Sequence, residues 1–269
     1  MNDESGKAPF SRTPKKGQEA HTGCRKTPNP LLRQLNARLD KAIRAYHMLQ
    51  DNDQILVTVS GGADSMSLLW LLSKRFSIYA KNLQLYAVYI DMGFGTAVEH
   101  RIEQMNRFSQ SLQVKTHVIR TQIGPYGHSD HNTENPCFLC TRIRRKHIFA
   151  AAEKLGCNKI VFGHHKDDLV ETLLINMIFG REISTCPPML RVKDGRYHLL
   201  RPLAFVEEAL LKRFAEENQL PIFSQDCPSA GHSQRQFVKE LVTGLEVKFP
   251  GARDNIFFSM AKVKKDYLL

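Results

Sequence analysis

The sequence lacks several features that would place a protein in a class at once. No apolar run approaches the roughly 18 residues that a membrane span requires. Residues 1–30 hold charges, prolines and glycines but no apolar stretch of the kind found in a secretory signal. No Gly-Lys-Ser or Gly-Lys-Thr string follows a glycine loop, which excludes a Walker A nucleotide site. We therefore expect a cytoplasmic protein with no membrane partner.

Cysteine is also scarce, with six residues in a chain of 269. Because the chain is large and shows no export signal, a disulfide scaffold is not expected, and a metal or redox site is favoured. Only one Cys-x-x-Cys pair occurs, Cys137 with Cys140, so a zinc site built from two such pairs is excluded. Cys24 and Cys157 are expected to be thiols of the tail and of the core.

Acidic residues are too few to balance the basic ones. The chain has 38 Lys and Arg against 27 Asp and Glu, a formal net charge of +11 and a pI near 9.4. This excess favours a polyanionic partner such as a nucleic acid, although a basic protein without such a partner remains an alternative. We expect a disordered basic tail over residues 1–30, a nucleotide-binding domain over 31–205, and a helical segment over 206–269 that contributes a third cysteine.

One short segment carries the strongest chemical signal. It lies between the apolar runs 55–59 and 66–72, in the order strand, glycine turn, helix, which is typical of a phosphate-binding loop. The glycines allow a sharp turn, and the helix start offers free N–H groups to an anion. A carboxylate beside a phosphate requires a cation such as Mg²⁺ between them. The segment consists of Ser60, Gly61, Gly62, Ala63, Asp64 and Ser65.

Strands and helices alternate along the first two thirds of the chain. Strands are expected at 55–59, 83–90 (ending at Asp91), 114–119 and 159–162, and helices at 31–49, 66–72, 99–112, 138–155 and 167–179. We predict an α/β fold, a parallel twisted sheet with helices on both faces and a helical C-terminal part. Residues 121–136 are expected to form a loop, 191–201 a hairpin, and 206–218, 233–243 and 252–264 helices. Right-handed crossovers would place the glycine loop at the carboxyl edge of the sheet, where ligands bind.

The cysteines form a second group of candidate residues. Cys137 and Cys140 begin a helix, and Cys227 lies in a loop of similar character. Three cysteines suit a [4Fe–4S] cluster with one open iron, while zinc completed by His164 or His232 stays open as an alternative. Cys186 could be inert or a sulfur carrier. Basic residues that follow Cys140 could bind phosphates or form a solvated helix face; they are Arg142, Arg144, Arg145 and Lys146.

A third group follows the fourth strand and opens a helix. Gly163, His164 and the adjacent acids Asp167 and Asp168 belong to it. The paired acids could hold Mg²⁺ or orient an acceptor base. Helix capping accounts for Asp167 alone more easily than for the whole string.

These three groups together resemble one family, the tRNA 2-thiocytidine synthetases (TtcA-type) of the PP-loop ATP pyrophosphatases. The resemblance runs from about Leu31 to the C-terminus and includes further landmarks in the right order. Lysidine synthetases share the glycine loop and the His/Asp string but not the cysteines. The landmarks are Asn176-Met177, Pro187-Pro188, Arg201-Pro202-Leu203, Ser233-Gln-Arg-Gln236 and Phe249-Pro-Gly251.

The resemblance implies a reaction. ATP would adenylate the C2 oxygen of cytidine 32 in the anticodon loop of a tRNA, releasing diphosphate. Sulfur from a cysteine desulfurase persulfide, or from another sulfur donor, would then replace that oxygen by way of a [4Fe–4S] cluster. The cluster ligands would be Cys137, Cys140 and Cys227, and the enzyme would be a homodimer.

The resemblance also implies a role for each candidate residue. Asp64 would hold Mg²⁺ and act in catalysis with Asp167, Asp168 and Arg144. ATP would contact residues 60–65 together with Asp91, Gly163 and His164. The tRNA would contact Arg142, Arg145, Lys146 and Arg235. Three alternatives stay open: a PP-loop tRNA uridine thiolase, a lysidine synthetase, and a non-catalytic zinc-containing RNA-binding protein.

Overall fold

The structure is a computed structural model that describes residues 29–231 and 233–267. Residues 1–28 of the predicted tail, with Cys24, and the alternative zinc ligand His232 lie outside the described residues, while Pro30 of that tail already begins a helix. None of the described helices is long and apolar enough to cross a membrane.

The sheet has six strands in the order β3-β2-β1-β4-β6-β5. All neighbouring pairs are parallel except β5 and β6, which form an antiparallel hairpin at one edge. This confirms the predicted parallel sheet and the hairpin around Asp194-Gly195. The strands are β1 Gln54–Val59, β2 Gln84–Asp91, β3 Lys115–Arg120, β4 Lys159–Val161, β5 Met189–Val192 and β6 Tyr197–Leu200.

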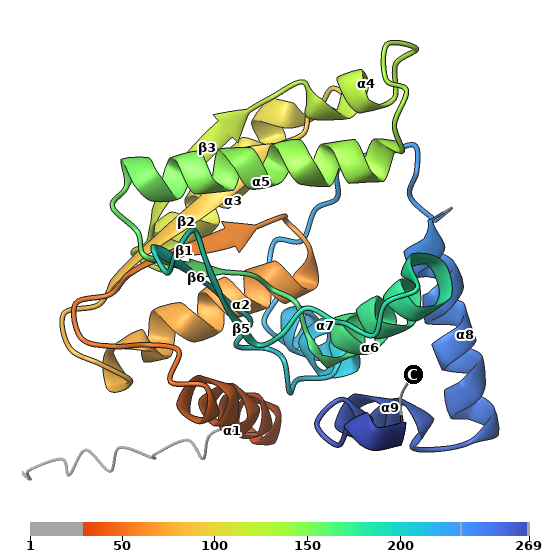
Figure 1. The fold of residues 1–269 in the computed structure, drawn as a ribbon. Helices are drawn as coiled ribbons and strands as arrows, with labels where there is room; N and C mark the ends of the chain where they lie inside the picture. Colours follow the sequence, from red (N-terminus) through yellow and green to blue (C-terminus); the bar gives the residue numbers. More distant parts are fainter. Residues whose placement is uncertain (1–28, 232, 268–269) are drawn as a thin grey trace, which may run out of the picture.

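The helices lie on both faces of this sheet (Figure 1). They are α1 Pro30–Ala45, α2 Ala63–Arg75, α3 Val98–Ser111, α4 Ile123–Gly127, α5 Pro136–Lys154, α6 Lys166–Ile175, α7 Glu208–Glu217, α8 Gln234–Lys248 and α9 Ala252–Ser259.

Two local predictions are wrong. The expected loop at 121–136 contains the short helix α4, where Gly124 packs against the ring of Phe94 so closely that a Cβ would lie 2.4 Å from it. The helix expected over 167–179 ends as α6 at Ile175 and continues as a π-helical turn, Asn176–Gly180. In both places the deciding contacts are tertiary or local backbone adjustments, which hydrophobic periodicity does not encode.

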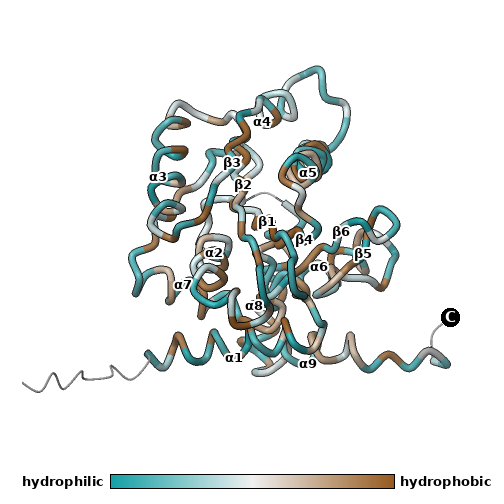
Figure 2. Tube along the Cα trace, turned by 90° about the vertical axis from the view of Figure 1, so that its left-hand side faces the viewer, coloured by the Kyte–Doolittle hydropathy of each residue, from teal (hydrophilic) through white to brown (hydrophobic). Residues whose placement is uncertain are grey.

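The core is divided by the sheet. On one face α1, α2, α3 and α7 pack against it through one large apolar cluster, and on the other face α5 covers the sheet. Figure 2 shows the hydrophobic strands β1 and β4 between α2 and α5. A smaller cluster joins α6 to α8 and α9. Leu211 and Phe214 of α7 belong to the large cluster, so packing is continuous across residue 205.

Helix starts bring the candidate residues to one edge. The strands β1, β2, β3 and β4 are parallel, so the helices that follow them begin at the carboxyl edge of the sheet. At α5, Pro136 occupies the first helical turn, and the Asn135 side chain accepts hydrogen bonds from the N–H groups of Cys137 and Phe138. The first turns of α2, α5 and α6 therefore share one edge.

Candidate nucleotide and cysteine site

The conformation of the glycine loop after β1 is fixed by hydrogen bonds of its own serines. Gly61 has a φ of 92°, a conformation that favours glycine. The N–H of Ser60 donates to Ser65 Oγ at 3.1 Å, and Ser65 Oγ donates to the carbonyl of Gly62 at 3.1 Å. Gly62 precedes α2 without a side-chain cap. No side chain therefore caps the first N–H groups of α2, and these groups are free to bind a phosphate.

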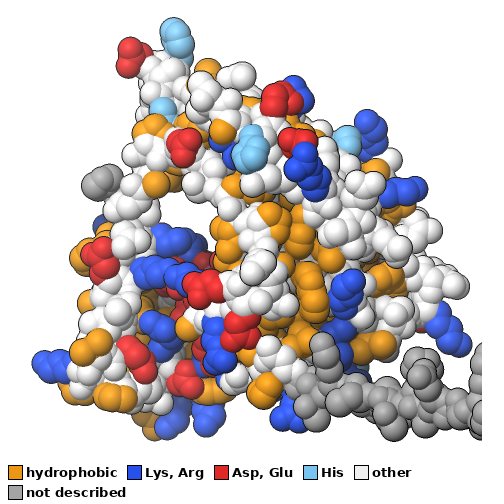
Figure 3. All heavy atoms as spheres, turned by 180° about the vertical axis from the view of Figure 1, so that it is seen from behind, with side chains coloured by type: hydrophobic (Ala, Val, Ile, Leu, Met, Phe, Trp, Pro, Cys, Tyr) orange, Lys and Arg blue, Asp and Glu red, His pale blue; other side chains and the backbone are white. Residues whose placement is uncertain are grey.

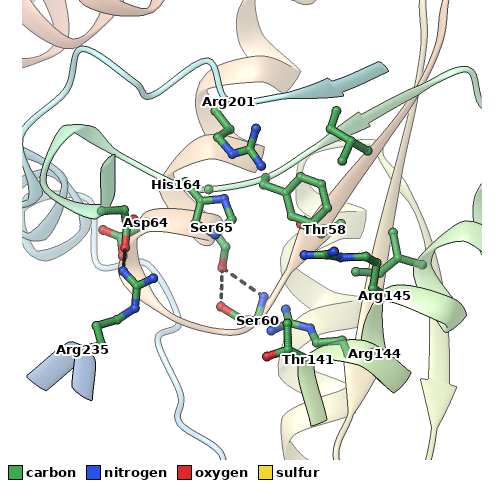
Figure 4. A pocket seen from close by; sticks show the side chains of 15 residues that line it. Thr58, Ser60, Asp64, Ser65, Thr141, Arg144, Arg145, His164, Arg201 and Arg235 are labelled. Carbon is green, nitrogen blue, oxygen red and sulfur yellow. Dashed lines mark hydrogen bonds and ion pairs between the residues drawn. The ribbon is translucent and has the colours of Figure 1, made fainter. Parts of the chain in front are cut away.

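A cavity of 380 Å³ opens beside this loop. Figure 4 shows Arg144 and Arg145 on one side of it, Arg201 on another, and Arg235 beside Asp64. The sequence groups around the glycine loop, the basic helix and the His/Asp string thus meet in one place. Its lining residues are Thr58, Ser60, Asp64, Ser65, Thr141, Arg144, Arg145, Ile148, Phe162, Gly163, His164, Asp168, Leu199, Arg201 and Arg235.

Asp64 is the carboxylate best placed to hold a cation. Burial raises its pKa, and its Oδ1 is buried with no hydrogen-bond partner among the described residues. Asp168 lines the same cavity and raises the pKa of Asp64 further by charge repulsion. An orphaned carboxylate oxygen beside a second acid and an anion loop fits Mg²⁺, which takes one or two carboxylates together with phosphate oxygens.

The basic residues of α5 divide into two sets. Arg144 and Arg145 line the cavity, and neither forms an ion pair with a described residue. Burial lowers the pKa of Arg144, so an anion in the cavity would relieve an uncompensated charge. Arg142 and Lys146 are exposed outside the cavity, and Arg142 pairs with Glu134 at 2.9 Å. Of these four basic residues, Arg144 and Arg145 are therefore the two that line the cavity.

Arg235 of α8 is already paired within the protein. Its Nη1 lies 3.0 Å from Asp168 and 3.1 Å from Glu171, and its Nη2 donates to Thr172 at 3.3 Å. Arg235 lines the cavity and also a neighbouring hollow that contains Cys137. Figure 3, seen from behind, shows basic and acidic side chains gathered along one rim of an opening in the molecule. The predicted tRNA contact at Arg235 thus lies between the loop and the cysteines.

The His/Asp string serves two different purposes. His165 and Asp168 form a reciprocal cap of α6: His165 N–H donates to Asp168 Oδ2 at 3.0 Å, and the imidazole accepts from the N–H of Asp168. His164 lines the cavity, where burial lowers its pKa to about 4. Its Nδ1 is buried and unpartnered among the described residues. Gly163 allows close approach, since a Cβ would lie 3.1 Å from the backbone of Ser65.

Two predicted site carboxylates, Asp167 and Asp91, do not line the cavity. Asp167 points toward the C-terminal helices, where it accepts from the N–H of Glu208 at 2.8 Å and pairs with Arg253 at 2.8 Å. Although burial opposes it, the hydrogen bond from His165 holds the pKa of Asp167 at about 2. Asp91 is buried against Arg101 at 3.2 Å. Both carboxylates are held by other groups of the protein, and neither lines the cavity.

The three predicted cluster ligands lie near one another. Burial raises the pKa of Cys140, and repulsion from Cys227 and Cys137 raises it further. A Cβ on Gly127 would lie 2.9 Å from Cys140 Sγ, and Cys227 Sγ lies 4.0 Å from His128 Nε2. Within the described residues, no three ligating side chains are gathered tightly enough to hold a metal ion. The thiols are free, and the donor set fits iron–sulfur ligation in kind.

Residues 220–229, which we call the strap, connect the two halves of the site. The N–H of Phe223 donates to the carbonyl of Gly61 at 3.0 Å. Gln225 joins the end of β2: Met92 N–H donates to Gln225 Oε1 at 2.7 Å, and Gln225 Nε2 donates to the carbonyl of Ile90 at 3.1 Å. Sequence reasoning missed Phe223 and Gln225, because nothing in the local pattern indicates that this segment returns to the glycine loop.

Comparison with known proteins agrees with this geometry. The family model of the PP-loop domain matches residues 31–244. The tRNA-cytidine(32) 2-sulfurtransferase of Polynucleobacter necessarius is 34% identical over 252 residues, covering 90% of this chain and 80% of the relative. That of Methylobacillus flagellatus is 36% identical over 233 residues, covering 85% and 75%.

A solved structure shares the fold. The U34-tRNA thiolase NcsA from Methanococcus maripaludis, with its [4Fe–4S] cluster, aligns with a TM-score of 0.73 at 21% identity, covering 86% of this chain and 79% of that one. Together with the family match and the identities above, the glycine loop and the cysteines establish that this chain belongs to the PP-loop family, among the tRNA-cytidine(32) 2-sulfurtransferases.

Proposed function

We infer that the protein is a tRNA-cytidine(32) 2-sulfurtransferase, an enzyme that uses ATP to exchange the C2 oxygen of a cytidine for sulfur. The observation that carries this proposal is the strap. The strap is hydrogen-bonded to the glycine loop and also contains the third cysteine, so the loop and the cysteines lie at the same edge of the sheet. The curated relatives have the same activity in their names.

The chain's own residues account for the activation step. A base carbonyl is a poor leaving group, and transfer of AMP to it from ATP, with release of diphosphate, makes it a good one. The N–H groups at the start of α2 would stabilise the diphosphate. Asp64 would hold Mg²⁺, which neutralises charge on the phosphates when it is bound. We propose that Arg144 stabilises the negative charge that develops on the phosphates during AMP transfer, and that Asp168 orients the reacting groups.

The cysteines would supply the second chemistry. Cys137, Cys140 and Cys227 would hold a [4Fe–4S] cluster, which supplies an open iron for a sulfur atom when it is bound. A cysteine desulfurase persulfide is the proposed sulfur donor. We further propose a cytoplasmic homodimer.

The tRNA would meet the exposed basic face of α5. Arg142, Arg145 and Lys146 lie on this helix close to the cavity, and the net charge of +11 attracts the RNA backbone. An anticodon loop can present its bases unstacked, which a reaction on a base requires. Arg235 would contact the RNA only after leaving Asp168 and Glu171.

One experiment tests this function. The protein is purified without oxygen, and its iron and zinc are measured. It is then incubated with tRNA, ATP and sulfide, and the nucleosides are analysed. We expect iron without zinc, and 2-thiocytidine that forms only with ATP.

The alternatives give different outcomes in the same experiment. Colourless, iron-free protein with tightly bound zinc would support the RNA-binding alternative. Thiouridine would identify a uridine thiolase, and lysidine formed on addition of lysine would identify a lysidine synthetase.

A further inference from the structure

The cavity has one half that phosphate chemistry does not explain. Ser60, Asp64 and Ser65 line the half beside the glycine loop. The other half is lined from β4, β6 and α5 by flat or apolar side chains. A highly charged phosphate gains nothing from the apolar members of this surface, whereas an aromatic ring packs well against them. These lining residues are Ile148, Phe162, His164, Leu199 and Arg201.

Two of these side chains form an offset stack. The rings of Phe162 and His164 lie 5.6 Å apart between centroids and within 27° of parallel. Both side chains are half-buried, so they keep a face toward the cavity. Nucleic-acid-binding proteins use such rings to stack an unpaired base. The guanidinium carbon of Arg201 also lies over the Phe162 ring, 5.8 Å from its centroid, so the three side chains form one continuous wall of the cavity.

Two buried polar atoms beside the stack have no partner among the described residues. They are Nε of Arg201 and Nδ1 of His164. Arg201 is 7% exposed, and its Nη1 donates to the carbonyl of Pro187, which fixes the guanidinium. A buried polar atom left unpaired costs about 1–3 kcal/mol, so this pair indicates a ligand with complementary groups. A pyrimidine carries a carbonyl oxygen and a ring nitrogen on one edge.

We propose that Phe162, His164 and Arg201 form the binding subsite for the acceptor pyrimidine, flipped out of an RNA loop into the cavity. The base packs against the wall formed by Phe162, His164 and Arg201, and Arg201 and His164 hydrogen-bond its edge. This subsite lies next to the glycine loop, so the activated oxygen is close to the phosphate half. The assignment rests on the proposed function, since it requires that the acceptor is a base.

A pair of RNA hairpins tests the subsite. Both carry the same anticodon stem and loop, one with cytidine at position 32 and the other with an abasic nucleotide there. Their dissociation constants with the anaerobically purified protein are measured by fluorescence anisotropy without ATP. We expect the wild-type protein to bind the cytidine hairpin roughly tenfold more tightly, the scale of one base–aromatic stack. In Phe162→Leu this preference should fall below about threefold.

The matched control is Phe149→Leu. Phe149 lies on α5, contacts the ring of Tyr197 at 5.3 Å between centroids, and does not line the cavity. Its variant should keep the wild-type preference. If Phe162→Leu fails to fold, His164→Asn is measured in the same way and should also lose the preference.

The outcomes separate this inference from the proposed function. Wild-type protein that makes 2-thiocytidine, with an undiminished preference in Phe162→Leu or His164→Asn, would overturn the subsite alone. A wild-type protein that thiolates but does not distinguish the two hairpins would overturn it as well. A wild-type protein that binds neither hairpin and makes no 2-thiocytidine would overturn the proposed function.

Discussion

At the scale of single residues, two chemistries are assigned to side chains that do not touch. Asp64 lies in the cavity beside the glycine loop, while Cys140 lies at the start of α5 against Gly127. The two adjacent histidines also differ: His165 caps α6, whereas His164 lines the cavity. Variants of these residues can therefore test each role separately.

Asp64→Ala and Cys140→Ala should have opposite effects. Asp64→Ala should reduce AMP formation at least about a hundredfold, because the phosphates lose their cation, and should leave iron content unchanged. Cys140→Ala should lose most of the iron and keep ATP-dependent diphosphate release. Iron analysis and a diphosphate assay measure both properties. Equal iron loss in both variants would show that the two sites are not separable.

The stability of the protein should depend on pH through His164. Its pKa is lowered by burial from 6.5 to about 4, so the unfolded chain binds more protons than the folded one between these values. Stability should therefore be complete above about pH 6.5 and fall as the pH drops toward 4, by at most about 3 kcal/mol. Urea unfolding at pH 7 and 5 measures this, and His164→Gln should flatten the difference. An equal difference in both proteins would contradict the assignment.

At the scale of elements, the site depends on segments that meet at the carboxyl edge of the sheet. Short apolar runs predicted every strand from β1 to β4, because a buried parallel strand requires such a run, and the residues after the first run predicted the glycine loop. The hairpin β5–β6 followed from its Asp-Gly turn. The position of the strap could not be predicted from the sequence, since Gln225 and Phe223 bind backbone atoms that are far away along the chain. The same holds for Asp91, whose partner Arg101 neutralises it.

Gly61→Ala should test the contact between the strap and the glycine loop. A Cβ at Gly61 would lie 2.4 Å from the Phe223 ring and 2.8 Å from its carbonyl oxygen. We expect a loss of about 2–4 kcal/mol, from overpacking and from the positive φ together, with impaired ATP use. Thermal unfolding and diphosphate release measure these effects.

Gly195→Ala is the control for that variant. Gly195 has a φ of 86° in the β5–β6 turn, and a Cβ there would meet nothing within 4 Å. It should show only the cost of the backbone conformation, about 1–2 kcal/mol. Equal losses in both variants would mean that the strap does not press on the loop.

At the scale of the whole molecule, charge and layering decide where RNA can bind. Composition revealed the excess of basic residues. It could not reveal which arginines are available to RNA, because the sequence does not show which of them form ion pairs within the protein. Arg235 is held by Asp168 and Glu171, whereas Arg144 and Arg145 make no ion pair with a described residue. The fold thus leaves only some of the many basic side chains without an acidic partner among the described residues, and these are available to a substrate.

The affinity for tRNA should fall steeply with salt. Each phosphate contact adds to the slope of log K against log salt concentration, so Lys146→Ser and Arg142→Ser should each reduce that slope by about one. Arg107→Ser should leave it unchanged, because Arg107 lies on α3, across the sheet from α5. Titrations at several salt concentrations measure the slope. A reduction by Arg107→Ser alone would contradict the assigned face.

The strap has a thermodynamic consequence for the molecule as a whole. The strap is bonded to the carbonyl of Gly61 and also carries Cys227, so a ligand at one site that shifts this segment would change the binding energy at the other. Linkage then requires reciprocity: the factor by which cluster loading alters the affinity for ATP is the factor by which ATP alters the affinity for the cluster. If this factor exceeds one, depletion of ATP would weaken cluster binding, and loss of the cluster would weaken ATP binding by the same factor.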